Sequence, residues 1–125
     1  MTLADGCFDP LHVGHVRYLQ HAAQIGHPLV VHIASDEAIR AKGREPFQER
    51  SERAETIYAL GVVDMVRMHD SLADAIRDLK PRCLVKGKDW IGRLPLEIRQ
   101  ACHEVGAEIS YTDTQTETST ERLAR

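Results

Sequence analysis

The sequence has few cysteines, few aromatic residues and no long apolar run. Its three cysteines, Cys7, Cys83 and Cys102, are scattered and form no CxxC pair, so neither a disulfide framework nor a cysteine-based zinc site is expected. No stretch approaches the roughly 18 consecutive apolar residues that a membrane-spanning helix needs. No signal-peptide pattern is found either, and together these features predict a reduced, cytoplasmic compartment and no membrane partner.

An excess of charge of either sign is also missing. The chain has 16 basic and 19 acidic residues and no basic motif interleaved with aromatic residues. This balance disfavours broad electrostatic binding to nucleic acid or to anionic membranes. The P-loop pattern GxxxxGK[ST] is absent as well, which excludes a P-loop kinase or ATPase.

Strand and helix signals alternate along the chain, whose 125 residues suffice for one buried core, so residues 1–125 are expected to form a single domain. Strands are predicted at 3–8, 29–34, 62–68, 83–85 and 107–111. Helices are predicted at 13–25, 49–60, 71–80 and 95–105, with a partly helical loop over 35–47 and a tail with a short helix over 112–125. This alternation predicts an α/β fold, a Rossmann-like three-layer domain whose five-stranded, mostly parallel sheet has the order 3-2-1-4-5.

Two polar segments follow predicted strands, residues 6–15 after the first and residues 86–90 after the fourth. In open α/β sheets, ligands bind beyond the carboxyl ends of the strands at the point where the strand order reverses. The order 3-2-1-4-5 makes the first and fourth strands neighbours. The two segments would then face each other across one crevice, where we expect the functional site.

Residues 5–15, Asp-Gly-Cys-Phe-Asp-Pro-Leu-His-Val-Gly-His, place two histidines three residues apart at a strand-to-helix turn. The N–H groups that such a turn leaves without partners favour an anion. His12 and His15 add donors that can follow negative charge as it develops on a phosphate. Two histidines at this spacing could also form a metal pair or lie on the surface, but the surrounding turn favours a phosphate-handling enzyme.

The same segment resembles the signature of the small cytidylyltransferase-like nucleotidyltransferases, which is a glycine, Phe-Asp, two residues and His-x-Gly-His. Every fixed position of that signature is matched, from Gly6 and Phe8-Asp9 to His12-Val13-Gly14-His15. The resemblance continues in Ala-Ser-Asp-Glu at 34–37, Glu-Arg-Ser-Glu-Arg at 49–53, Leu-Val-Lys-Gly-Lys-Asp-Trp at 84–90 and Ser-Thr at 119–120. The likeness thus covers nearly the whole chain.

This resemblance implies that a phosphate oxygen attacks the α-phosphate of a nucleoside triphosphate and releases pyrophosphate. The nucleophile is already ionised near neutral pH, so positioning and charge stabilisation must supply most of the rate. His12, His15 and Lys42 are expected to act on the reacting phosphates. Mg²⁺ or another divalent ion would bridge the triphosphate oxygens, with Asp9 as a possible partner.

The remaining site residues are expected to hold the nucleotide. Gly14 would let the backbone approach the phosphates, and Arg53 could bind a phosphate bidentately unless an ion pair with a neighbouring glutamate occupies it. Trp90 could instead cap the core, and the other histidines are expected to be structural or solvated. The expected nucleotide contacts are Gly6, Cys7, Phe8, Asp9, Gly14, Arg53, Lys86, Gly87, Asp89, Trp90, Ser119 and Thr120.

Two subfamilies compete for the substrate. Residues 84–89 and 35–43 look like the heptose-1-phosphate adenylyltransferases, whereas Asp89-Trp90 and the chain length look like the glycerol-3-phosphate cytidylyltransferases. The second group carries Arg-Thr-x-Gly-Ile-Ser-Thr-Thr near its end, and here only Ser119-Thr120 remains of that run.

The sequence therefore favours adenylyl transfer to a sugar phosphate such as a heptose 1-phosphate. The alternative is cytidylyl transfer to glycerol 3-phosphate or another polyol phosphate. A third reading, favoured by the altered tail, is a catalytically weak, nucleotide-binding regulatory module. By analogy with the relatives, a homodimer is expected.

Overall fold

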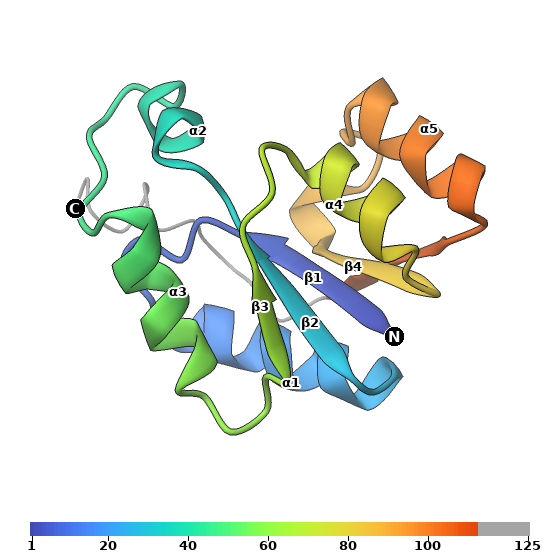
Figure 1. The fold of residues 1–125 in the computed structure, drawn as a ribbon, viewed down its shortest axis with the longest axis horizontal. Helices are drawn as coiled ribbons and strands as arrows, with labels where there is room; N and C mark the ends of the chain where they lie inside the picture. Colours follow the sequence, from blue (N-terminus) through green and yellow to red (C-terminus); the bar gives the residue numbers. More distant parts are fainter. Residues whose placement is uncertain (113–125) are drawn as a thin grey trace.

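Five strands form the centre of the computed structural model, which describes residues 1–112 (Figure 1). The strands are β1 (Thr2–Gly6), β2 (Leu29–Ile33), β3 (Met65–Arg67), β4 (Cys83–Gly87) and β5 (Glu108–Thr112). They are hydrogen-bonded in the order β3-β2-β1-β4-β5, and every described pairing is parallel. The predicted fold class and strand order are confirmed.

Helices cover both faces of this sheet, which gives the three predicted layers (Figure 1). α1 (Val13–Ile25) and α3 (Arg50–Tyr58) lie on one face, and α4 (Leu72–Leu79) and α5 (Leu96–Val105) lie on the other. The short helix α2 (Asp36–Arg40) follows β2, and the 3₁₀ helix η1 (Lys88–Trp90) follows β4. None of the helices within residues 1–112 is long and apolar enough to cross a membrane.

The central strands supply two separate cores because their side chains alternate between the faces of the sheet. Val31 and Val85 are fully buried against α1 and α3, whereas Val30 and Leu84 are fully buried against α4 and α5. Strands covered on both faces have near-continuous apolar runs, which is the pattern found in residues 29–33.

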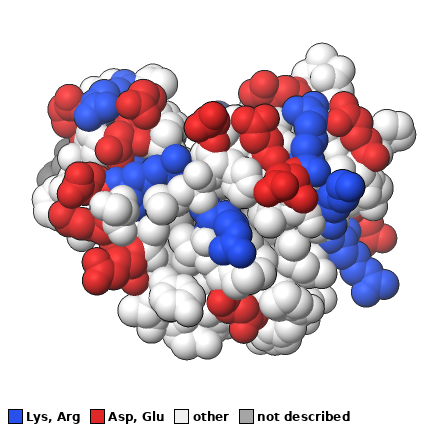
Figure 2. All heavy atoms as spheres, in the orientation of Figure 1, with Lys and Arg blue, Asp and Glu red and all other residues white. Residues whose placement is uncertain are grey.

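Among the strand boundaries that differ from the prediction, two change the setting of the site. β1 ends at Gly6, because Phe8 has a φ of 52°, in the left-handed region that a strand cannot accommodate. β4 continues to Gly87, so Lys86 lies within the strand. On the face of the molecule in Figure 2, acidic and basic side chains are interspersed, in keeping with the balanced composition.

Candidate active site

A pocket opens at the carboxyl ends of β1 and β4, where the strand order reverses. Both predicted segments contribute to its wall, together with α1 and the segment that follows β2. The lining residues are Asp5, Gly6, Cys7, Phe8, His15, Tyr18, Ala34, Lys42, Arg44, Lys86, Gly87, Asp89 and Trp90. The structure therefore brings together, in the predicted crevice, most of the site residues inferred from the sequence.

Tyr18 is located where β1 and β4 separate to form this crevice. The strand pairing runs from Thr2 to Ala4 on β1, and beyond it the Tyr18 hydroxyl accepts a hydrogen bond from the Asp5 N–H at 3.0 Å. The same hydroxyl donates to the carbonyl of Val85 on β4. Burial raises the pKa of Tyr18, so the hydroxyl stays protonated and bridges the two strands.

His12 and His15 form a capping box at the start of α1. His12 is the N-cap: its Nδ1 accepts the Gly14 N–H at 3.1 Å, and Nδ1 of His15 accepts the His12 N–H at 3.2 Å. A ring nitrogen that accepts an N–H must carry a lone pair, so these bonds assign the proton of each neutral ring to Nε2. The helix start thus orients two Nε2–H donors.

Two glycines make room for the rings of this turn. A Cβ on Gly14 would lie 2.9 Å from Cε1 of His12, and a Cβ on Gly6 would lie 2.8 Å from Cζ of Phe8. The buried Phe8 ring in turn meets the His15 ring edge-on, with centroids 5.1 Å apart. The sequence predicted that Gly14 lets phosphates approach the backbone. In this structure, the His12 ring occupies the space where a Gly14 side chain would begin.

Lys42 reaches the pocket from the loop after α2. Its Nζ lies 3.3 Å from Sγ of Cys7, and within residues 1–112 no carboxylate pairs with it. Sulfur is a weak hydrogen-bond acceptor. Lys42 therefore lies on the pocket wall without a carboxylate partner among residues 1–112, and its contact with a phosphate stays a prediction.

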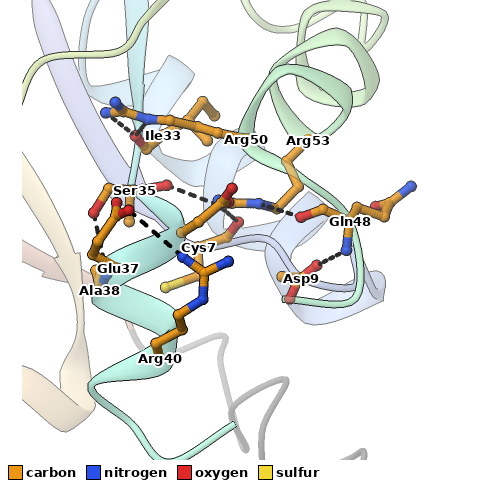
Figure 3. A network of polar contacts seen from close by, with 12 residues as sticks. Cys7, Asp9, Ile33, Ser35, Glu37, Ala38, Arg40, Gln48, Arg50 and Arg53 are labelled. Atoms are coloured by element: carbon orange, nitrogen blue, oxygen red, sulfur yellow. Dashed lines mark hydrogen bonds and ion pairs between the residues drawn. The ribbon is translucent and has the colours of Figure 1, made fainter. Parts of the chain in front are cut away.

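Asp9 anchors that same loop, which differs from its expected role at a metal ion. The carboxylate is fully buried, and its Oδ2 accepts from Arg44 Nη1 and from the Phe47 N–H, each at 2.8 Å. Oδ1 accepts the Gln48 N–H at 2.7 Å (Figure 3). Burial alone would raise the pKa of Asp9, but these donors lower it. Because its oxygens are occupied by the loop, Asp9 does not line the pocket.

Arg53 is a second correction, since it does not face the pocket. Its side chain is fully buried and pairs with Asp36 at 2.7 Å, not with Glu49 or Glu52. The guanidinium also donates to the carbonyl oxygens of Cys7, Ala34 and Gln48 (Figure 3 labels Cys7 and Gln48). A guanidinium bound in this way has its donors committed to the protein, so Arg53 holds three loops together instead of binding a phosphate.

Lys86 lies on the opposite wall. Its Nζ is 3.0 Å from Oδ2 of Asp5 and 4.5 Å from the centre of the Trp90 ring. The other oxygen of Asp5 is 2.8 Å from Nδ1 of His32. Burial opposes ionisation of Asp5, yet Lys86 and His32 lower its pKa to about 2.

Sequence reasoning missed Asp5, Tyr18 and Arg44, and it assigned His32 no specific role. The sequence did carry a signal for the pair Asp5–His32, because both are polar residues near the ends of otherwise apolar strands. They are also partners in the β1–β2 register, which only the structure reveals. Ser119 and Thr120, expected to hold phosphates, lie outside the described residues.

A family model described as cytidylyltransferase-like matches residues 3–123. The chain belongs to the cytidylyltransferase-like family. The signature at Gly6–His15 indicated this family from the sequence.

Relatives within this family share about two fifths of their aligned residues with the chain. The D-beta-D-heptose 1-phosphate adenylyltransferase of Bordetella bronchiseptica is 40% identical over 95 residues, which are 72% of this chain and 59% of that protein. The bifunctional protein HldE of Campylobacter fetus is 43% identical over 97 residues, 74% of this chain and 21% of that protein. The chain therefore spans only part of the length of these relatives.

A solved structure is also similar to this chain over nearly its whole length. The lipopolysaccharide core biosynthesis protein from Thermoplasma volcanium superposes with a TM-score of 0.80 at 27% identity. The match covers 92% of this chain and 97% of that one. This likeness supports the fold and strand order described above.

Proposed function

We propose that this chain is a nucleotidyltransferase that transfers AMP from ATP to a sugar phosphate of the heptose 1-phosphate class. The observation that carries the proposal is the capping box at the start of α1, which orients the Nε2–H donors of His12 and His15, together with the pocket that His15 and Lys42 both line. The acceptor class comes from the name of the Bordetella bronchiseptica relative.

In the proposed reaction, an oxygen of the sugar phosphate attacks the α-phosphorus of ATP. The new P–O bond joins AMP to the sugar phosphate, and the bond to pyrophosphate breaks. The attacking phosphate is already ionised, so no residue needs to act as a strong base. His12 and His15 donate to the phosphate oxygens as charge builds up, and Lys42 holds an adjacent phosphate.

A divalent ion is part of the proposal. Residues 1–112 contain no cluster of three or more His, Cys, Asp or Glu that could cage a metal. An ion such as Mg²⁺ does not need a cage of protein ligands, because it keeps several waters and binds through substrate phosphates plus one or two carboxylates. With Asp9 buried and Asp5 paired, Asp89 is the carboxylate on the pocket wall that can contact such an ion, whose charge would neutralise phosphate oxygens.

The nucleotide itself would lie between the two walls. We assign the contacts with it to Gly6, Cys7 and Phe8 on one side and to Lys86, Gly87 and Trp90 on the other, because all of them line the pocket. Contacts from Ser119 and Thr120, and a homodimer, stay predictions.

The test is pyrophosphate release by the purified chain, measured with ATP or CTP, Mg²⁺ and either a heptose 1-phosphate or glycerol 3-phosphate. Fastest release from ATP with the heptose 1-phosphate supports the proposal. Turnover of CTP with glycerol 3-phosphate instead would establish the polyol alternative. Nucleotide binding by calorimetry without turnover of any pair would identify a regulatory module, and either of these results overturns the proposal.

A further inference from the structure

We propose that Asp5 is a positioning residue that holds the Lys86 ammonium in place for the nucleotide phosphates, and that His32 fixes Asp5 from the other side. The inference rests on the proposed contact between Lys86 and the nucleotide. It concerns residues on three adjacent strands, β2, β1 and β4, which run through the centre of the sheet.

The two oxygens of Asp5 have separate partners. Oδ1 is 2.8 Å from Nδ1 of His32, and Oδ2 is 3.0 Å from Nζ of Lys86. The three side chains are only 3% (His32), 7% (Lys86) and 12% (Asp5) exposed. A carboxylate bound at both oxygens cannot rotate freely, so the position of Oδ2 determines where the ammonium lies.

A second contact holds the ammonium from another direction. Nζ lies over the Trp90 ring, 4.5 Å from its centre, and both residues line the pocket. An ammonium has three N–H donors, and a cation over an aromatic face is attracted by its negative charge density. One donor is used by Asp5, and the others remain for the phosphates of a nucleotide.

His32 is itself held in place. Its Nε2 lies 3.2 Å from the carbonyl oxygen of His69, in the segment between β3 and α4. Arg50 of α3 donates to that same carbonyl and to the carbonyl of Ile33 at the end of β2 (Figure 3 shows the bond to Ile33). The segment between β3 and α4 and Arg50 of α3, whose Nη2 lies 3.4 Å from Nε2 of His32, thus hold the ring against Asp5. The depressed pKa of Asp5 agrees with a carboxylate that stays ionised between two donors.

A purely structural role would have the opposite consequence for binding. If Asp5 only neutralised a buried lysine, its negative charge would repel phosphates, and its removal would leave ATP binding unchanged or stronger. If Asp5 positions Lys86, the removal of the Asp5 carboxylate weakens ATP binding because the Lys86 ammonium is no longer held where it can contact the phosphates. The two roles are therefore distinguished by the direction of the change.

The experiment is a double-mutant cycle on ATP affinity, measured by calorimetry on the full chain without acceptor. We expect Asp5→Asn and Lys86→Met each to weaken ATP binding roughly tenfold, as the loss of a charge-assisted hydrogen bond does. The double variant should bind no more weakly than Lys86→Met, since Asp5 acts through Lys86. His32→Gln, which leaves the ion pair intact, should give a smaller loss in the same direction and serves if Asp5→Asn folds poorly.

Arg77→Met is the matched control, because it breaks an exposed ion pair with Glu104 between α4 and α5 and should leave ATP affinity unchanged. Wild-type affinity in Asp5→Asn or in His32→Gln, tighter binding, or multiplied effects in the double variant would each overturn the inference. Absence of ATP binding by the wild type would overturn the proposed function and the inference together. Because no acceptor is present, a wrong choice of sugar phosphate does not affect the result.

Discussion

The ring of His12 is stacked on the ring of His15, with centroids 3.8 Å and planes 28° apart. Each ring also accepts a backbone N–H of the same turn, so the residues proposed to act on phosphate are also the N-terminal cap of α1. The donor geometry of the site and the start of the helix are therefore one structural feature. A single substitution affects both, and the two effects can be separated by the choice of replacement.

His12→Ala and His12→Asn separate these two roles. Asparagine is a good N-cap, whereas alanine is a poor one, so only His12→Ala should lower the free energy of unfolding, by about 1 kcal/mol. Both variants remove the ring donor and should lower turnover by about a hundredfold or more. Urea unfolding and pyrophosphate release measure the two effects. Wild-type turnover in His12→Asn would mean that His12 acts only as a cap.

Gly14→Ala tests whether the glycine of the signature serves the His12 ring. The added methyl group would lie 2.9 Å from Cε1 of His12 and must displace the ring, so turnover should fall at least tenfold. Gly61→Ala is the matched control, because no atom lies within 4 Å of its ideal Cβ and its φ is not positive. Equal turnover in the two variants would show that the ring position does not matter for catalysis.

The sequence was sufficient for features that depend on local pattern. The bounds of α1 were predicted at 13–25 because its apolar positions recur with helical spacing and Gly26 ends it. The strand order followed from the alternation of strands and helices, together with the rule that places a ligand site where the order reverses. The pocket therefore lies where the sequence predicted it.

Roles that depend on tertiary contacts could not be predicted in this way. The family resemblance predicted that Asp9 and Arg53 contact the nucleotide, whereas both bind the protein's own loops. The pair of Asp5 and His32 depends on strand register, and a shift of one residue would separate the two side chains onto opposite faces. Side-chain partners across the sheet are thus the part of the site that required a structure.

Asp9→Asn tests the loop anchor. An amide cannot accept at both positions, so one of the N–H donors from Arg44, Phe47 or Gln48 loses its partner in a buried place. We expect the free energy of unfolding to fall by about 3 kcal/mol and the KM for ATP to rise, because the loop that carries Lys42 is released. Urea unfolding and steady-state kinetics measure these effects.

The control for Asp9→Asn lies on the same loop. Glu45→Gln breaks an exposed ion pair with Arg40 and should change the stability by less than about 1 kcal/mol and leave the KM unchanged. If Asp9→Asn matched Glu45→Gln in both measurements, Asp9 would not anchor the loop.

Acid should destabilise the protein through Asp5 in a defined pH window. The pKa of this carboxyl is about 2 in the folded protein against an ordinary value of 3.8, so the unfolded chain binds the proton more readily. A depressed pKa stabilises the fold fully above the unfolded value, and that stabilisation is lost as the pH falls through the folded value. Asp5 should therefore contribute about 2 kcal/mol at pH 7 that disappears between about pH 5 and pH 2.

Urea unfolding of the wild type and of Asp5→Asn at pH 6, 5, 4 and 3 measures this contribution. The wild type should lose stability more steeply than Asp5→Asn below pH 5, so the two free energies converge as the pH falls. The lowered pKa of Asp9 acts in the same direction in both proteins and cancels from the difference. Parallel curves would show that Asp5 titrates in the folded protein as it does in the unfolded chain, and the ion pair with Lys86 would then contribute nothing to the charge state of the site.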